Sequence, residues 1–151
     1  MLVKDLMTKN VVAVKPSMDV HQLAELFMKK DISGAPVVDE EGKFLGVVLE
    51  ESLVFQNKNV HLPTFVNLAG AILSFGAHRF EEELKKITGS KVSDIMETKA
   101  LTLSPETPIE DVATMMIEKN IHYFPVLEKG ALVGVITKKD IVRGIAEGKL
   151  I

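Results

Sequence analysis

An internal repeat constrains the fold of this chain more than any other feature. Displacing the sequence by 89 positions aligns its first part with its last part, and after one residue drops out near Glu41 a displacement of 88 continues the alignment. Together the two displacements superpose 13 identical residues, among them Pro16 on Pro105 and Gly46 on Gly134. Chance does not produce two displacements that differ by a single residue, so the chain contains a duplicated unit.

The repeat divides the chain into three parts. The first unit covers residues 1–56, the second covers 91–151, and residues 57–90 form an insert that has no counterpart. A unit of about 55 residues would be only marginally stable alone, because it buries little apolar surface. We therefore expect the two units to pack on each other, sheet against sheet.

The pattern of each unit predicts a strand, a helix, two further strands and a closing helix. Residues 11–14 are rich in valine and end before Pro16, which is typical of a short strand. Apolar residues then recur at helical spacing in both units: Val20, Leu23, Ala24 and Phe27, and Ile109, Val112, Ala113 and Met116. The fold class that follows is α+β.

The boundaries of these elements also have sequence signals. Thr107, Pro108 and Glu110 predict a capping box at the start of the helix of the second unit, and Asn120 suits the left-handed residue that ends it. Two apolar runs, 35–38 and 44–49, flank a turn that contains glycine and predict a hairpin. The second unit repeats the hairpin at 124–127 and 131–136, followed by a closing helix at about 138–147.

The insert has a weaker pattern. Phe80, Leu84 and Ile87 share one face of a helix that ends at Gly89, and a shorter helix is expected from Pro63. These helices either cover the hydrophobic seam of the repeats or form a surface that docks a partner or a second copy. The sequence leaves both interpretations open.

Composition excludes several classes of function. The chain has no cysteine, which removes disulfides, thiolate metal sites and cysteine nucleophiles. Its 18 basic and 21 acidic residues produce no field that would hold DNA or RNA. The four histidines have no metal-ligand spacing, and neither a GxSxG motif nor a phosphate-binding glycine loop occurs. We expect no catalytic residues and no metal site.

We also find no pattern in the sequence that is typical of a signal peptide or a membrane span. The longest weakly polar run, 62–77, is shorter than the roughly 20 apolar residues that span a bilayer. The first ten residues carry charges and no apolar core of the signal-peptide kind. We expect a cytoplasmic protein without a membrane span.

Chemically, the most informative segment is GVITKKD at residues 134–140, where the last strand meets the closing helix. Unpaired N–H groups and the helix dipole make such a junction favourable for anions. Gly134 allows a close approach to the backbone, Thr137 offers a hydroxyl, Lys138 adds positive charge, and Asp140 offers a carboxylate. A carboxylate that accepts from two vicinal hydroxyls, beside donors for a phosphate, suits a nucleoside phosphate.

The same residues have a purely structural interpretation. Thr137 and Asp140 have the spacing of a capping box, which needs no ligand. The first unit has Leu49 and Ser52 at these places and therefore lacks both the hydroxyl cap and the carboxylate. The pattern predicts one ligand seat rather than two.

These motifs resemble the cystathionine-beta-synthase (CBS) domain family. The resemblance rests on a repeated Asp-[Leu/Ile]-Met start at residues 5–7 and 94–96, an apolar-Pro-Val step at 35–37 and 124–126, and the segment G-x-[LV]-[LV]-G-[VI]-[VI]-T-x-x-D that ends at Asp140. It covers both repeats and implies a tandem pair, called a Bateman module. The implied fold is two β-α-β-β-α units packed about a pseudo-twofold axis, with adenosyl ligands in the clefts between them.

The resemblance also implies roles for particular residues. Asp140 would hold the ribose of AMP, ADP, ATP or S-adenosylmethionine, and Thr137 would hold the phosphate of the three nucleotides. The adenine would lie near Leu101 and the segment formed by Ile121, His122, Tyr123 and Pro125. Tyr123 or His122 either stacks on the base or covers the hydrophobic seam. In the first repeat, Thr8, Ser33 and Lys4 are candidates to contribute to a weaker site.

The function implied is regulatory and non-catalytic. A ligand that bridges the repeats would change their angle or a dimer contact, and a protein target would detect that change. The family resemblance implies a homodimer and no required cofactor. The alternative is a scaffold or interaction module without a ligand, with the insert as its docking surface.

Overall fold

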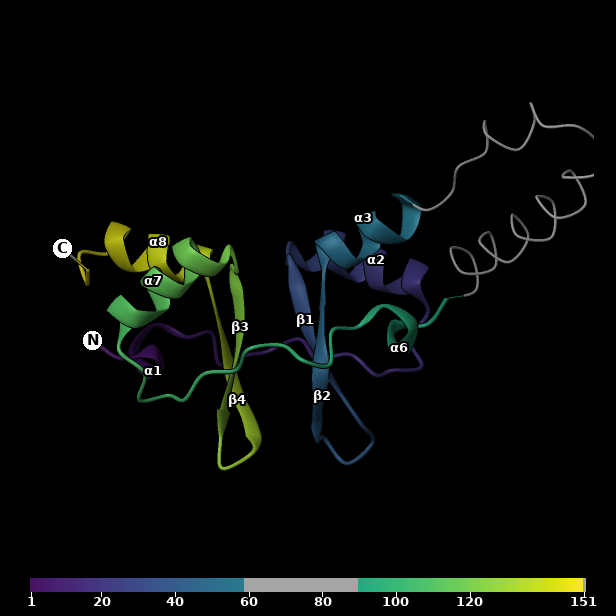
Figure 1. Ribbon diagram of the computed structural model, residues 1–151, viewed down its shortest axis with the longest axis horizontal. Coiled ribbons are helices and arrows are strands. Elements are labelled where there is room, and N and C mark those ends of the chain that lie inside the picture. The colour runs from purple at the N-terminus through teal and green to yellow at the C-terminus, as the bar shows by residue number, and fades with distance from the viewer. Residues whose placement is uncertain (59–89, 151) are drawn as a thin grey trace, which may run out of the picture. The chain divides into compact units, whose positions relative to one another are not determined.

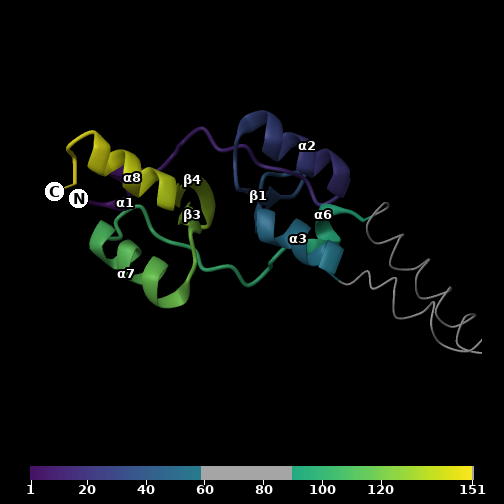
Figure 2. The same ribbon diagram turned by 90° about the horizontal axis from the view of Figure 1, so that it is seen from above.

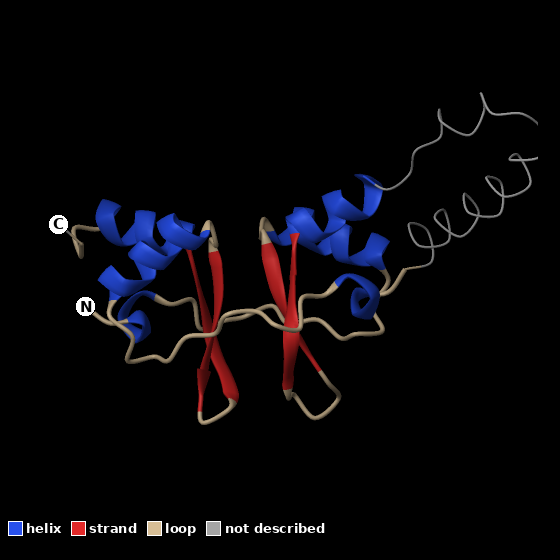
Figure 3. Ribbon diagram, viewed as in Figure 1, coloured by secondary structure: helices blue, strands red, loops and turns tan. Residues whose placement is uncertain are grey.

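The structure is a computed structural model that describes residues 1–58, with only the backbone at 55–58, and residues 90–150 (Figure 1). The helices expected within the insert lie outside the described residues. Two small sheets and several helices make up the described part (Figure 3). The α+β class predicted from the repeat is confirmed.

Each repeat contains one hairpin. Strand β1 (Gly34–Val38) pairs with β2 (Phe44–Leu49). Strand β3 (Tyr123–Glu128) pairs antiparallel with β4 (Ala131–Thr137), with Tyr123 opposite Thr137. Both residues between β3 and β4, Lys129 and Gly130, have positive φ angles of 52° and 82°, as the primed turn of a two-residue hairpin requires.

The strand predicted at residues 11–14 is wrong except at its last residue. Val14 forms a single parallel bridge to Val37 of β1, through 2.9 Å hydrogen bonds with Pro36 and Val38. The second repeat has the same arrangement, because Leu103 bridges in parallel to Val126 of β3. Pairing stays this short because Val11 uses its N–H in a local turn to Lys9, while Pro16 has no N–H to donate.

The first long helix of each repeat forms as its apolar stripe predicts. Helix α2 (Val20–Lys30) begins at a capping box of Asp19 and Gln22. Helix α7 (Ile109–Lys119) begins after Pro108, so the capping box predicted from Thr107 and Glu110 is wrong. The N–H of Ile109 instead donates to the carbonyl of Met1 at 3.0 Å, so a backbone carbonyl far away in sequence replaces the side-chain cap. Asn120 ends α7 in the left-handed conformation, as predicted.

Two short helices have no counterpart in the sequence prediction. They are α1 (Val3–Leu6) and α6 (Val92–Ile95), at the repeated Asp-[Leu/Ile]-Met start. In each, the aspartate accepts a hydrogen bond from the backbone N–H three residues earlier: Asp5 from Leu2 at 2.9 Å, and Asp94 from Lys91 at 2.8 Å. The repeated aspartate is therefore explained by helix capping.

The closing helices are α3 (Glu50–Lys58) and α8 (Lys138–Ala146). Packing divides the chain into two compact units that cut across the repeats: Met1–Val14, Ala35–Val47 and Glu97–Ile151 form one, and Lys15–Gly34 with Val48–Met96 form the other. In the first, α1 lies beside α8 (Figure 2). In the second, α6 and α2 both contact α3.

The core around β3 and β4 therefore includes side chains from the start of the chain. Val3 and Leu6 of α1 are buried together with Leu103, which precedes α7, and with residues of α7, β3 and β4: Ile109, Val112, Met116, Phe124, Val126 and Ile136. Val3 also donates its backbone N–H to Thr107 at 2.9 Å. The start of the chain, which the sequence repeat assigns to the first unit, thus completes the core of the second repeat.

Candidate functional site

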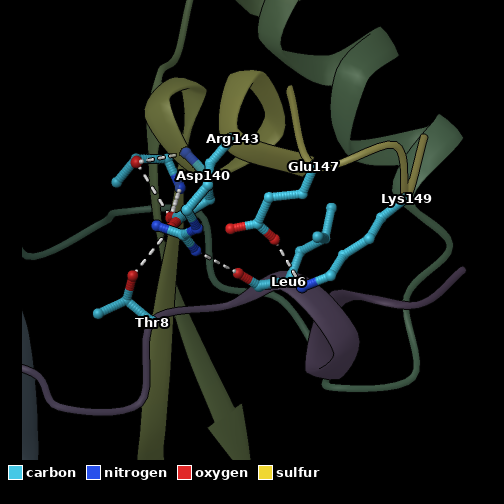
Figure 4. A network of polar contacts seen from close by, with 7 residues as sticks. Leu6, Thr8, Asp140, Arg143, Glu147 and Lys149 are labelled. Atoms are coloured by element: carbon cyan, nitrogen blue, oxygen red, sulfur yellow. Dashed lines mark hydrogen bonds and ion pairs between the residues drawn. The ribbon is translucent and has the colours of Figure 1, made fainter. Parts of the chain in front are cut away.

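The junction between β4 and α8 holds the residues that carried the sequence prediction. Thr137 is the last residue of β4 and the N-cap of α8, and Asp140 is the third residue of that helix (Figure 4). The two form a reciprocal capping box, which is the structural alternative that the sequence offered. Asp140 is only 2% exposed, the lowest exposure of any described acidic residue.

Four donors surround the carboxylate of Asp140. Its Oδ2 atom accepts from the backbone N–H of Thr137 at 2.8 Å and from the Thr137 hydroxyl at 3.0 Å. Its Oδ1 atom accepts from the hydroxyl of Thr8 at 2.8 Å and from a guanidinium nitrogen of Arg143 at 2.7 Å. A carboxylate offers about four acceptor positions, so those of Asp140 are all in use.

Arg143 extends this network to α1. The same guanidinium nitrogen that binds Asp140 also donates to the carbonyl of Leu6 at 3.1 Å (Figure 4). Thr8 is held further by two backbone hydrogen bonds with Val135 of β4, at 2.8 and 3.0 Å. The segment 1–14 is therefore attached to the β4–α8 junction through both its backbone and its side chains.

A further ion pair lies just after the end of α8. Lys149 donates to Glu147 at 2.7 Å, and this contact holds the pKa of the Glu147 carboxyl below its usual range. Both side chains are about half exposed, so the pair contributes little to stability. It is separate from the donors of Asp140.

Gly134 is buried beneath this junction. A Cβ atom on Gly134 would lie 2.9 Å from the carbonyl oxygen of Thr8 and 2.8 Å from the sulfur of Met7. The group that closely approaches Gly134 is therefore the chain's own backbone, and the approach of a ligand to this glycine stays a prediction. Gly46 of the first repeat lies in the same way against the carbonyl of Glu97.

The residues expected around an adenine lie along β3 and the segment before it. Tyr123 and Pro125 are buried, Ile121 is half-buried, and His122 and Leu101 are exposed. The backbone joins some of them: the carbonyl of His122 accepts from the N–H of Lys138 at 3.1 Å. The exposed His122 and the buried Tyr123 thus have different environments.

Tyr123 is electrostatically linked to Asp140. Burial of the phenol and the nearby charge of Asp140 raise the pKa of Tyr123 above its ordinary value. Tyr123 therefore keeps its proton to a higher pH than an ordinary tyrosine does. Lys138, in contrast, is exposed at the first position of α8.

Sequence reasoning missed Arg143 and assigned Thr8 and Lys4 to the other repeat. Thr8 and Lys4 were expected to serve the first repeat, but Thr8 binds Asp140, and Lys4 forms a 2.9 Å ion pair with Glu106 of the second. The sequence could have indicated Arg143, because it follows Asp140 by three positions and residues three apart on a helix are neighbours. No sequence pattern could have indicated that Thr8 binds Asp140, since the two residues lie 132 positions apart.

The corresponding junction of the first repeat has weaker capping. Ser52 stands in the place of Asp140, and its hydroxyl accepts from the N–H of Leu49 at 3.2 Å. The carbonyl of Ser33 accepts from the N–H of Glu50, as His122 does for Lys138 in the second repeat. This junction has the backbone geometry of the second repeat without the buried charge.

Two further observations concern the described residues as a whole. No group of three or more histidines, aspartates and glutamates within 1–58 and 90–150 could hold a metal ion. None of the helices in these ranges is both long and apolar enough to cross a membrane. The cytoplasmic location expected from the sequence stays a prediction.

Comparison with known proteins identifies the repeated unit. The CBS domain profile matches residues 3–57 and 92–147, more than half of the chain. The uncharacterized protein MJ1426 of Methanocaldococcus jannaschii is 32% identical over 154 residues, which cover 96% of this chain and 91% of that protein.

A plant relative provides a solved structure. CBSX2 of Arabidopsis thaliana, called chloroplastic, is 28% identical over 97% of this chain, which spans 64% of the plant protein. The crystal structure of CBSX2 in complex with AMP has a TM-score of 0.75 at 26% identity and covers 99% of this chain and 98% of that one. Some relatives have enzyme names: the chain spans 24% of the homoserine O-acetyltransferase of Methanohalobium evestigatum, at 24% identity.

Proposed function

Because this chain belongs to the CBS domain family and carries two such domains in tandem, we propose that it is a non-catalytic regulatory module that binds an adenosyl ligand. The ligand is AMP, ADP, ATP or S-adenosylmethionine, bound between the repeats. The observation that supports this most directly is the complex of the similar protein CBSX2 with AMP. The proposal treats 1–56 and 91–151 as the two repeats and 57–90 as their linker.

The ligand is proposed to bind at the β4–α8 junction. Asp140 accepts from the ribose hydroxyls, while Thr137, Lys138 and the first N–H groups of α8 bind the phosphate. The backbone beside Gly134 is proposed to line the bottom of this binding site. A ligand without phosphate, such as S-adenosylmethionine, would use the ribose contacts alone.

The base is proposed to lie against exposed or half-buried residues near β3. Leu101 is 42% exposed and Ile121 is half-buried, so both have apolar surface to offer. His122 is the residue with an exposed ring for stacking, whereas Tyr123 and Pro125 support it from the buried side. The first repeat lacks the carboxylate, so the proposal places a single seat in the chain.

Regulation requires a partner that detects the bound state. We propose that this partner is a protein target, contacted by a homodimer of the chain. Two pairs of equivalent apolar positions are exposed in both repeats: Met28 with Ile117, at 82% and 83%, and Val54 with Val142, at 67% and 58%. Apolar exposure that recurs at equivalent positions favours a symmetric interface, since a second copy presents the same residues.

The test is a ligand titration monitored by thermal unfolding. AMP, ADP, ATP and S-adenosylmethionine are added separately to the full chain, and a ligand at 100 times its Kd stabilises by about 2.7 kcal/mol. Asp140→Asn, which keeps the shape of the side chain, should abolish the shift, while Ser52→Ala should leave it intact. If none of the four raises the midpoint of the unmodified chain, the alternative of a ligand-free scaffold is correct.

A further inference from the structure

The buried carboxylate of Asp140 sets a condition on any ligand that uses it. Its side chain is 3% exposed, and each of its oxygens already accepts two hydrogen bonds. A ribose that donates two hydroxyls needs acceptor positions that are now occupied. Binding must therefore replace existing donors.

The two oxygens differ in which donors can be replaced. Oδ2 binds Thr137 within the capping box, and losing those bonds would uncap α8. Oδ1 binds Thr8 and Arg143, which belong to no helix cap. The guanidinium side chain of Arg143 is 46% exposed, so it can move into solvent without losing hydration.

The replaceable donors also help to hold the start of the chain at the β4–α8 junction. Thr8 lies on the segment 1–14, and Arg143 joins this segment by donating to Leu6. We infer that a ribose binding to Asp140 displaces Thr8 and Arg143 and thereby loosens the segment 1–14 from the β4–α8 junction. This inference rests on the proposed function and identifies the element that changes when the ligand binds.

Thermodynamic linkage makes the coupling reciprocal. If the ligand weakens the attachment of the segment, weakening that attachment must strengthen the binding of the ligand by the same factor. Thr8 and Arg143 then compete with the ligand for Asp140. In the alternative, Thr8 and Arg143 contact the ligand directly and support its binding. The alternative predicts that removing either side chain weakens binding, whereas the displacement predicts that binding becomes tighter.

The first measurement is hydrogen exchange on the unmodified chain with and without AMP. Thr8 and Val135 bond to each other through their backbone N–H groups, so their amides report whether the segment is attached. We expect AMP to accelerate exchange at both amides. Unchanged or slower exchange at these amides in the AMP-bound chain would overturn the inference while leaving the proposed function in place.

The second measurement is the affinity of variants for AMP by calorimetry. Thr8→Val keeps the shape of the side chain and removes the hydroxyl, and Arg143→Met removes the charge and keeps the length. Each should bind AMP about tenfold more tightly, the effect of losing one competing charge-assisted hydrogen bond. Thr114→Val, whose hydroxyl bonds to the carbonyl of Glu110 on α7, is the matched control and should not change the affinity.

The outcomes separate the two levels of the proposal. Tighter binding by Thr8→Val and Arg143→Met, with faster exchange in the bound chain, supports the displacement. Weaker binding by either variant means that its side chain serves the ligand, which refutes the displacement. If neither the unmodified chain nor the two variants bind AMP, ADP, ATP or S-adenosylmethionine, the proposed function fails and the displacement fails with it.

Discussion

The backbone of Gly134 and the carbonyl of Thr8 lie so close that a Cβ atom on the glycine would be 2.9 Å from the carbonyl oxygen. The contact joins β4 to a segment that precedes it by more than 120 residues, and it is reinforced by the two backbone hydrogen bonds between Thr8 and Val135. Close packing at this glycine is therefore a condition for attaching the start of the chain.

Gly134→Ala should destabilise the protein by about 1–3 kcal/mol, because the added methyl group meets a backbone atom that cannot move alone. Gly144→Ala is the control: the atoms nearest to its Cβ would be side-chain ends of Leu6 and Leu150 rather than backbone, and alanine favours the helix. Urea unfolding measures both. Equal losses from the two substitutions would show that the approach of Thr8 is not what requires glycine at 134.

Leu6→Ala should destabilise the chain by about 2–5 kcal/mol, since Leu6 is buried in the core of the second repeat. Ile95 is the equivalent residue of the other repeat and is half-buried, so Ile95→Ala should cost clearly less. The free energies of unfolding in urea compare the two. A larger loss for Ile95→Ala would contradict the packing of α1 described above.

Lys129→Asn should stabilise the protein by about 0.5–1 kcal/mol. Lys129 has a φ angle of 52° in the turn between β3 and β4, where asparagine followed by glycine is favoured. Lys9→Asn, at an exposed position without positive φ, removes the same charge and should leave the melting temperature nearly unchanged. The prediction is wrong if Lys129→Asn and Lys9→Asn have the same melting temperature.

Stability should fall at alkaline pH because of Tyr123. Its folded-state pKa is raised by burial, so above the ordinary value near 10 the unfolded chain loses the proton while the folded chain keeps it. The contribution is complete below about pH 10 and decreases as pH rises through and beyond that value. Tyr123 is the single tyrosine of the chain, so its ultraviolet absorbance reports ionisation directly.

The control for this pH effect is Tyr123→Phe. Between pH 9 and 11 its free energy of unfolding should fall less than that of the unmodified chain. The titration of the lysines affects both proteins equally. In the unmodified chain, phenolate absorbance should rise only together with unfolding. Ionisation of Tyr123 near pH 10 while the circular dichroism of the folded chain persists would contradict the burial described here.

Ile117→Glu should shift the chain toward the monomer if the exposed apolar positions form the proposed dimer interface. A charge at an apolar contact is buried without a partner, which disfavours association. Sedimentation velocity over a range of concentrations measures the equilibrium, and Glu118→Lys on the same helix is the control. A monomeric unmodified chain, or dimers that persist in Ile117→Glu, would refute this interface.

Local patterns accounted for the elements that local interactions form. The stripes of α2 and α7, the two hairpins, the left-handed Asn120 and the capping box of Thr137 and Asp140 all depend on residues within a few positions of one another. The cap of α7 failed as a prediction because a distant carbonyl, that of Met1, takes the place of the side chain. The short helices α1 and α6 were not predicted, because a helix of four residues is too short to show an apolar period.

By itself, the sequence determined that the chain is duplicated, which type of unit is repeated, and which copy retained the acid and the hydroxyl. Only the tertiary structure decided which segment lies beside which. It placed α1 against α8 rather than within its own repeat, and it attached Thr8 to Asp140. The physical reason is that equivalent segments of a repeat have nearly the same apolar pattern, so the pattern specifies what each segment buries but not against which copy.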